Sequence, residues 1–231
     1  GTMDTCAYMF LRVYVLAILL LLLFARNDLA RISLKLGLIG GVAGLVAELF
    51  YFRDYWLPPT ILGQGTISFE DFIFGFSITA LSAILYPVLT RTTFENKFTP
   101  YKKLFGLFFI VGAVALLLFN IVLDINSIFV SSILFALFTV IILILRTDLI
   151  KQAVVSSILI TGAIIVIYMI LFNKIVPNFW NDYWFFAGTK YDVRIFGNVP
   201  LTELLWYFTW ILLGSVSYPF VTGKALISRK R

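Results

Sequence analysis

Seven long apolar stretches limit what this chain can fold into. Each is close to the roughly 20 residues that an α-helix needs to cross the hydrocarbon core of a membrane. Only 13% of the residues are charged, against about 25% in soluble domains. The sequence therefore predicts an all-α integral membrane protein, a single membrane domain over residues 1–231, with seven transmembrane helices. The stretches cover residues 8–24, 34–52, 69–89, 104–123, 128–145, 153–172 and 199–221.

Basic residues in the loops predict the orientation of these helices. Of the 18 Lys and Arg residues, thirteen lie at the end of the bundle that holds the C-terminus, and five, Arg12 among them, at the other end. Loops on the cytoplasmic side of a membrane carry the excess of Lys and Arg. We therefore expect an integral protein of the cell (inner) membrane, with its N-terminus outside and its C-terminus in the cytoplasm.

Four short motifs occur twice in the same order. RNDLAR begins at residue 26 and is repeated as RTDLIK at 146, and RDYW at 53 is repeated as NDYW at 181. SFEDFIFGF at 68 is matched by PLTELLWYF at 200, and LYP at 85 by SYP at 217. Two three-helix units keep the same orientation when one further helix joins them, because the linker crosses the membrane once. The sequence therefore predicts a parallel 3+1+3 repeat, with units at residues 7–90 and 127–223 and a linker helix at 101–124.

Each predicted unit carries acidic residues at the start of its third helix: Glu70 and Asp71 in the first and Glu203 in the second. Helix capping is one explanation, because Ser68-x-x-Asp71 fits a capping box and a carboxylate suits the positive end of a helix dipole. Catalysis is the other. An acid among apolar side chains near a membrane boundary is costly to ionise, and a protonated acid can donate a proton.

Three further residue sets have both a functional and a structural interpretation. Glu48 lies late in the second apolar stretch, either as an intramembrane functional acid or as an acid that reaches the outer boundary. Trp56 and Trp184 suit an aromatic belt at the membrane interface, or the cover of an apolar pocket. Asp54 and Asp182, beside these tryptophans, are expected to be solvated or to pair with a basic residue of the same face.

The residue inventory excludes several kinds of chemistry. The chain has no histidine and one cysteine, which removes His-based triads, haem, His-ligated metals and intrachain disulfides. No glycine-rich dinucleotide fingerprint is present. The net charge of +6 arises from loop residues and predicts membrane topology, so no nucleic acid partner is expected.

The repeated acid-aromatic segments resemble the lycopene cyclase domain family, the membrane-embedded carotenoid cyclases. That family carries a Pro-x-Glu-Glu type motif before an aromatic-rich helix in each three-helix unit. Here the motif reads SFEDFIF at residues 68–74 and PLTELLW at residues 200–206, and the DYW loops add weaker similarity. Neither copy is complete, and only its second acidic position, Asp71 and Glu203, is acidic in both. The resemblance covers residues 8–223.

The resemblance implies a lycopene-like cyclase, an isomerase of carotenoid biosynthesis that needs no cofactor and no metal. An acid protonates the terminal double bond of a linear polyene, the carbocation closes a ring, and a base removes a proton. Asp71 and Glu203 are the implied acid and base, with Glu70 modulating the first. The implied substrate pocket consists of Glu48, Phe74, Trp206, Tyr207, Trp210, Trp56 and Trp184. The implied partners are a lipophilic polyene and membrane lipid; a homo-oligomer is left open.

Two other functions are alternatives to cyclisation, and a third is excluded. A small-solute transporter of the parallel 3+1+3 type has the same predicted topology. A non-catalytic relative that binds a lipid or carotenoid needs the same pocket without turnover. A covalent retinal protein is excluded, because the seventh apolar stretch contains no lysine and Lys224 lies beyond its end.

Overall fold

The computed structural model describes residues 1–229 and confirms an all-α architecture with seven long apolar helices. Lys230 and Arg231, which were counted in the charge pattern, lie outside the described residues. Within residues 1–229, all seven predicted stretches coincide with helices long and apolar enough to cross a membrane. These are α1 (Thr2–Ala25), α2 (Ala30–Asp54), α3 (Phe69–Thr90), α4 (Lys102–Leu116) continued by the π-helix η2 (Leu117–Val122), α5 (Ser127–Leu145), α6 (Ile150–Ile170) continued by the π-helix η4 (Leu171–Ile175), and α8 (Leu201–Thr222).

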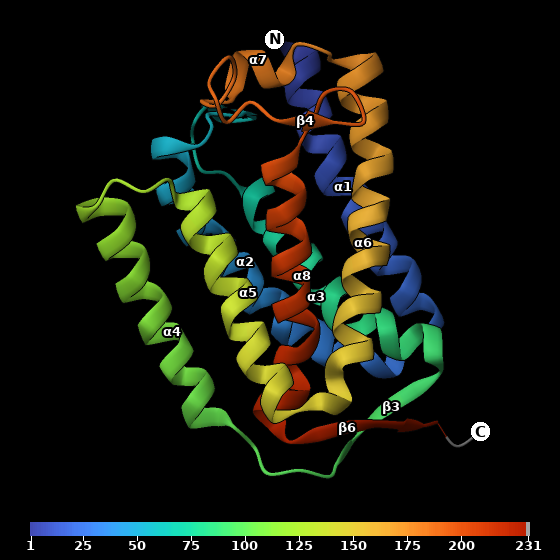
Figure 1. The fold of residues 1–231 in the computed structure, drawn as a ribbon. Helices are drawn as coiled ribbons and strands as arrows, with labels where there is room; N and C mark the ends of the chain where they lie inside the picture. The colour runs from blue at the N-terminus through green and yellow to red at the C-terminus, as the bar shows by residue number, and fades with distance from the viewer. Residues whose placement is uncertain (230–231) are drawn as a thin grey trace.

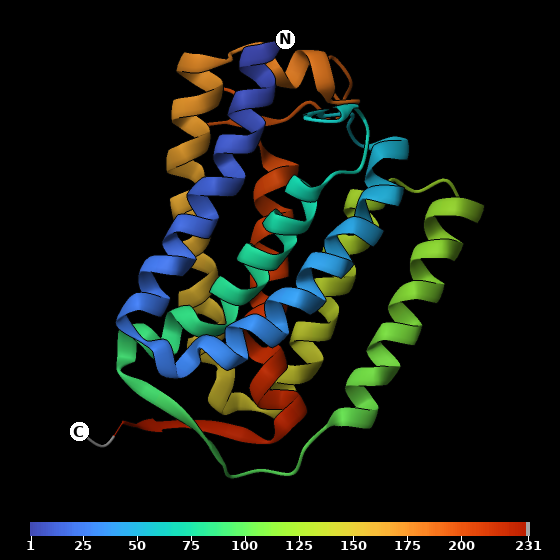
Figure 2. The ribbon, with the colours of Figure 1, turned by 180° about the vertical axis from the view of Figure 1, so that it is seen from behind.

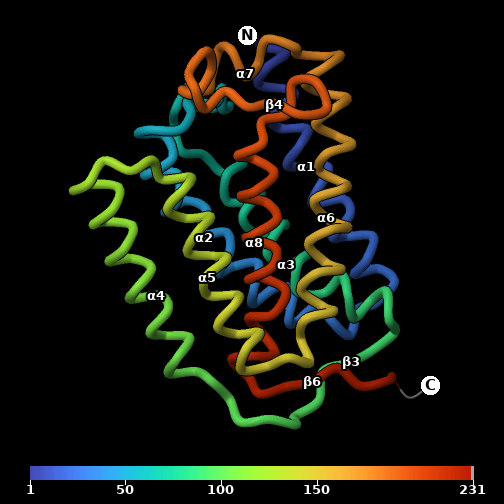
Figure 3. The backbone as a smooth tube through the Cα atoms, in the orientation of Figure 1, coloured from blue at the N-terminus to red at the C-terminus, as the bar shows by residue number. Residues whose placement is uncertain are grey.

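Helices α3 and α8 lie together at the centre of the bundle (Figures 1 and 2). Helices α1 and α2 pack on α3, and α5 and α6 pack on α8. Helix α4 stands at the side, against α5, and a long connection brings the chain to it (Figure 3). The termini lie at opposite ends, as expected for an odd number of crossings (Figure 1).

Shorter elements close the two ends of the bundle. The end near the N-terminus carries the helix α7 (Phe179–Tyr183) and two small hairpins (Figure 1). These hairpins pair β1 (Pro59–Thr60) with β2 (Gly63–Gln64) and β4 (Arg194–Ile195) with β5 (Val199–Pro200). At the opposite end, β3 (Thr92–Asn96) and β6 (Lys224–Ser228) form an antiparallel pair that joins the segments following α3 and α8.

Glycines allow α2 and α3 to pack closely. Gly40 lies against Gly75, and a Cβ on Gly40 would come within 2.5 Å of the Gly75 carbonyl oxygen. The rings of Phe72 and Phe76 lie over Gly41 and Gly37 on the same face. Small residues spaced four apart allow backbones to approach in membrane helices, where apolar lipid provides no hydrophobic drive for association. This contact fixes how α2 is rotated about its axis.

The repeated RNDLAR and RTDLIK segments form two matching arginine clamps. In the first, Arg26 donates to both carboxylate oxygens of Asp28 at 2.8 Å, to the Pro87 carbonyl at 3.0 Å and to the Thr92 carbonyl at 2.8 Å. The residues after the arginine form a 3-10 turn, η1 (Asn27–Leu29), that leads into α2. The clamp therefore ties the α1–α2 turn to the end of α3.

The second clamp repeats these contacts. Arg146 donates to Asp148 at 2.7 and 2.8 Å, to the Pro219 carbonyl at 3.3 Å and to the Lys224 carbonyl at 2.7 Å. A 3-10 turn, η3 (Thr147–Leu149), follows it and leads into α6. Because these turns continue into helices, the second and sixth membrane-spanning segments begin at residues 27 and 147, earlier than hydrophobicity predicted. The structure therefore gives both repeated turns the same role.

The outer surface of the bundle is apolar along the helices, as lipid contact requires. Phe24, Ile110 and Ile144 are among many large hydrophobic side chains that are more than half exposed. In the hydrocarbon region, backbone polar groups must be paired inside the protein, which long helices achieve. The core is richest in aromatic residues near the N-terminal end of α1, where Tyr8 and Trp180 are fully buried.

Candidate active site

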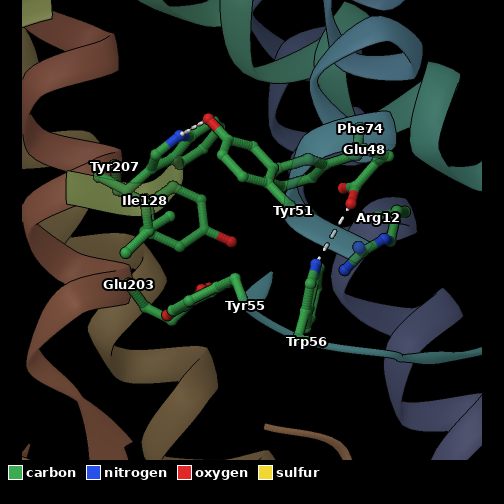
Figure 4. A pocket seen from close by; sticks show the side chains of 10 residues that line it. Arg12, Glu48, Tyr51, Tyr55, Trp56, Phe74, Ile128, Glu203 and Tyr207 are labelled. Carbon is green, nitrogen blue, oxygen red and sulfur yellow. Dashed lines mark hydrogen bonds between the residues drawn. The ribbon is translucent and has the colours of Figure 1, made fainter. Parts of the chain in front are cut away.

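A small cavity lies near the N-terminal end of α1, between α1, α2, α3, α5 and α8. Its volume is about 30 Å³, which is enough for one or two water molecules. Its wall combines one arginine and two carboxylic acids with aromatic rings (Figure 4). The lining residues are Arg12, Glu48, Tyr51, Tyr55, Trp56, Phe74, Ile128, Glu203, Trp206 and Tyr207.

Glu203 lies in the first turn of α8 and faces this cavity. It is buried, and it accepts a hydrogen bond from the Tyr168 hydroxyl at 2.8 Å. The Tyr168 and Tyr207 hydroxyls are 2.9 Å apart, so a chain of hydroxyls connects the acid to a second point on the cavity wall. Tyr168 was not among the predicted site residues. It occupies the position 120 residues after Glu48, where the repeat could have drawn attention to it.

Glu48 approaches the same cavity from α2. Its side chain is buried, and Oε2 accepts a hydrogen bond from Trp56 Nε1 at 3.2 Å (Figure 4). The interpretation in which Glu48 reaches the outer boundary is therefore wrong, because the side chain turns into the bundle. The two acids that share a cavity in the structure are Glu48 and Glu203.

Arg12 is a site residue that sequence reasoning placed at the outer surface. It is 2% exposed, on α1, and it lines the cavity. Its guanidinium carbon lies 3.3 Å from the centre of the Tyr8 ring and 4.8 Å from that of Phe74. Its Nη2 is 3.9 Å from Oδ1 of Asp71. The available signal was its position inside an apolar stretch, since intramembrane charges face the protein interior.

Asp71 lies behind Arg12 and is not among the residues that line the cavity. It accepts hydrogen bonds from the Tyr8 hydroxyl at 2.6 Å and from the backbone N–H of Ser68 at 2.9 Å. The second contact is the predicted capping box at the start of α3. Glu70 turns away to the loop, where it accepts the Ile61 N–H at 3.1 Å.

The predicted aromatic residues divide into two layers. Phe74, Trp206, Tyr207 and Trp56 line the cavity, whereas Trp210 stacks on Trp206 at 6.2 Å, outside the lining. Trp206 Nε1 donates to the hydroxyl of Tyr51, a lining residue that the sequence did not single out, at 2.7 Å. The aromatic character of the predicted pocket therefore extends across the lining and one layer beyond it.

The two DYW segments, residues 53–56 and 181–184, pair with each other to form a cover. Tyr55 and Trp56 of the first segment line the cavity, whereas Trp184 of the second packs on Tyr55 outside the lining. Trp56 and Trp184 form an antiparallel bridge, Leu57 N–H donates to the Tyr183 carbonyl at 2.9 Å, and Phe185 N–H donates to the Tyr55 carbonyl at 3.0 Å. Burial raises the pKa of the Tyr55 hydroxyl, which lies 2.9 Å from Thr202 Oγ1. The two loops are therefore parts of one cover and do not form separate surface belts.

Asp54, expected to be solvated or paired with a basic residue, has another role. Its carboxylate accepts hydrogen bonds from the side chains of Asn120 and Ser127 and from the Ser127 backbone N–H. That N–H belongs to the first turn of α5, where donors lack partners within the helix. Asp54 thus links the end of α2 to the start of α5.

A second cavity lies further along α1, between α1, α3 and α6. Its volume is about 110 Å³, and every lining side chain is apolar. The lining residues are Val15, Ile18, Leu81, Leu85, Leu159, Ile160, Ala163 and Ile164. The first cavity has acidic side chains on its wall that can exchange protons, whereas the wall of the second offers only apolar contacts.

Within residues 1–229, no group of three or more acidic or cysteine side chains is arranged to hold a metal ion. No protein-family model, curated protein or solved structure matches this chain.

Proposed function

We propose that this protein is a carotenoid cyclase, which closes a terminal ring on a linear polyene such as lycopene. The single observation that carries the proposal is a pair of buried carboxylic acids, Glu203 and Glu48, on the wall of one aromatic-lined cavity. Cyclisation needs a proton donor, a proton acceptor and a site that excludes bulk water. It is redox-neutral, so the protein side chains are sufficient for every step.

In this proposal Glu203 donates its proton to the terminal double bond of the polyene. The tertiary carbocation is attacked by a neighbouring double bond, a six-membered ring closes, and a carboxylate removes a proton to restore a double bond. The faces of Trp206, Phe74 and Trp56 stabilise the positive charge, because aromatic rings attract cations through their negative faces. Glu203 then regains the proton that the base took up, which the hydroxyls of Tyr207 and Tyr168 relay from the cavity to the acid.

Glu48 is the proposed base. Trp56 Nε1 donates to its carboxyl group, and Arg12 stands on the same cavity wall, so its ionised form has a donor and a nearby positive charge. The resemblance implied Asp71, and not Glu48, as the partner of Glu203 in acid-base chemistry. We propose instead that Asp71 is a positioning residue, which neutralises and orients Arg12 from behind.

Substrate binding has to enlarge the cavity, since about 30 Å³ does not admit a six-membered ring. The cover formed by the two DYW segments is the part of the wall outside the long helices. Its displacement would let an end group in, while the apolar second cavity of about 110 Å³ takes part of the chain. Closed covers that open for substrate are common in enzymes that protect reactive intermediates from water.

We further propose that the chain is a parallel 3+1+3 duplication. The matched arginine clamps and the packing of α1 and α2 on α3 and of α5 and α6 on α8 support it. The proposed orientation keeps the N-terminus and the cavity on the outer side of the cell membrane and the clamps on the cytoplasmic side.

Expression in a bacterial host that accumulates lycopene tests the proposed function. We expect cyclic carotenoids with the unchanged protein, and a loss of about 100-fold or more in cyclic product for Glu203→Gln and Glu48→Gln. Glu95→Gln, at the opposite end of the bundle, is the matched control and should leave the product unchanged. Pigment analysis by chromatography, with the protein quantified in the membrane, measures the result. A membrane-inserted protein that leaves lycopene unchanged contradicts cyclisation.

A further inference from the structure

The guanidinium of Arg12 has donors that the protein does not use. Within residues 1–229, its Nε–H has no hydrogen-bond partner. Asp71, at 3.9 Å from Nη2, lies beyond hydrogen-bond distance. The group instead rests on the face of the Tyr8 ring. A buried charged group normally has its donors satisfied, so a guanidinium in this state on a cavity wall marks a place for an acceptor.

Each of the surrounding acids accepts a hydrogen bond from a side chain other than Arg12. Glu48 accepts from Trp56, Asp71 accepts from Tyr8, and Glu203 accepts from Tyr168. A buried water molecule needs roughly 10–15 Å³ and two to four polar partners. The cavity provides about 30 Å³, a guanidinium that donates, and carboxyl groups that can each accept a further hydrogen bond. Water therefore suits the cavity in size and in hydrogen bonding.

We propose that this cavity is a water site and that the protein also hydrates the terminal double bond of its polyene. The inference rests on the proposed function, because the same acid, Glu203, produces the carbocation. The water, oriented by Arg12, donates one lone pair to the cation carbon and forms a C–O bond. Its surplus proton passes to the carboxylate of Glu48. The net reaction adds one water to one double bond and yields a tertiary alcohol, with no oxidant or reductant.

Hydration and ring closure are two fates of one cation. A purely hydrocarbon wall would leave ring closure and proton loss as the only routes. The observed wall places Arg12 and Glu48 in the same chamber as Glu203, so a nucleophile other than the polyene stands near the cation. The product ratio therefore reports on Arg12, which acts through the water as a positioning residue.

Mass spectrometry of pigments from lycopene-accumulating cells tests the inference. A cyclic product has the mass of lycopene, whereas a hydrate is heavier by one water molecule, and heavier again when cells grow in water enriched in oxygen-18. We expect both products from the unchanged protein, with the label found in the hydrate alone. Cyclic product with no hydrate overturns the inference and leaves the cyclase proposal standing. Hydrate with no ring overturns cyclisation only, and unchanged lycopene overturns both.

Variants of Arg12 make the test specific. Arg12→Leu combined with Asp71→Asn removes the donor without leaving a buried unpaired carboxylate. We expect the ratio of hydrate to cyclic product to fall about tenfold or more, the effect of losing one charge-assisted hydrogen bond. Arg12→Lys, which keeps the charge but shortens the reach, should lower the same ratio and covers the case in which the double variant does not fold.

The matched control neutralises one positive and one negative charge far from the cavity. Lys151→Gln with Glu95→Gln changes two exposed residues at the opposite end of the bundle, and it should leave the product ratio unchanged. A ratio that is the same in the Arg12 variants and in this control overturns the role of Arg12.

Discussion

Arg12 has a different role in the structure from the one that the sequence indicated. In the sequence it was counted with the charges at the outer end of the bundle. In the structure it is a buried cation that lies over the Tyr8 ring beside Asp71. A charge inside a membrane protein is costly and is kept where it has a partner or a task. Because Oδ1 of Asp71 lies 3.9 Å from Nη2, beyond hydrogen-bond distance, the guanidinium keeps free donors for the cavity.

Asp54 is the residue for which stability gives the clearest prediction. We expect Asp54→Ala to lower the free energy of unfolding by about 1–2 kcal/mol, because the Ser127 N–H in the first turn of α5 and the Asn120 side chain each lose an acceptor. Asp182→Ala is the matched control, since Asp182 holds the equivalent place in the other DYW segment but is exposed. Thermal unfolding in detergent, followed by tryptophan fluorescence, measures the difference. Equal effects of the two substitutions would show that the hydrogen bonds of Asp54 do not contribute to stability.

At the scale of elements, the glycine face of α2 sets the position of Glu48. A helix that packs with its backbone against α3 can adopt only one rotation, and Glu48 lies two turns after Gly40 and Gly41 along it. The same contact places the start of α3, and with it Asp71, beside α1. The geometry of the acid site therefore depends on glycines, which have no side chain that could take part in the reaction.

Gly40→Ala tests this dependence. Its Cβ would meet the Gly75 carbonyl oxygen, which belongs to the backbone and cannot rotate away, so we expect a loss of about 1–3 kcal/mol in stability. Gly106→Ala is the control, because no atom lies within 4 Å of its Cβ, and a small gain is expected from helix propensity. Unfolding midpoints of the two variants in one detergent give the comparison. An unchanged midpoint for Gly40→Ala would rule out close α2–α3 packing.

The arginine clamps give a prediction that concerns both halves of the chain. Arg146→Gln removes two contacts to Asp148 and leaves the carbonyls of Pro219 and Lys224 without their donor. We expect a loss of about 2–3 kcal/mol, discounted because Asp148 is partly exposed. Arg26→Gln should cost a similar amount, as its contacts are the same. Lys151→Gln, at an exposed position nearby, should be neutral in the same unfolding assay, and a cost there would argue against the clamps as the cause.

At the scale of the whole molecule, the two halves are joined at both ends of the bundle. The β3–β6 pair joins them at one end, and the two DYW segments join them at the other, above the cavity. The site takes Arg12 and Glu48 from the first half and Glu203 from the second. Neither half holds the proposed acid and base together, so the chemistry belongs to the assembled bundle.

Membrane orientation can be tested on the chain as it stands, because Cys6 is the one cysteine in the sequence and its side chain is exposed. We expect a membrane-impermeant maleimide to label Cys6 in intact cells, since the N-terminus is predicted outside. In the variant Cys6→Ser with Ser228→Cys, labelling should require permeabilised membranes. Cys6→Ser alone should stay unlabelled. Protection of Cys6 in intact cells, with labelling at position 228, would reverse the proposed topology.

The number of helices able to cross a membrane, their approximate limits and the repeated turns could all be predicted from the sequence. Length and apolarity are sufficient for this, because a segment in lipid must pair its own backbone groups and so forms a helix. The capping box at Ser68 was equally local and is present in the structure. The repetition of the two arginine turns was visible in the sequence, whereas the contacts of Arg26 and Arg146 were not predicted.

The polar residues that meet in the site depend on how the helices pack. The spans are apolar on all sides, since lipid and protein interior are equally apolar surroundings, so hydrophobic periodicity cannot tell which face of a helix points inward. That face is set by contacts such as Gly40 against Gly75. Such contacts turned Glu48 and Arg12 toward Glu203, placed Asp71 behind Arg12, and directed Glu70 to a loop.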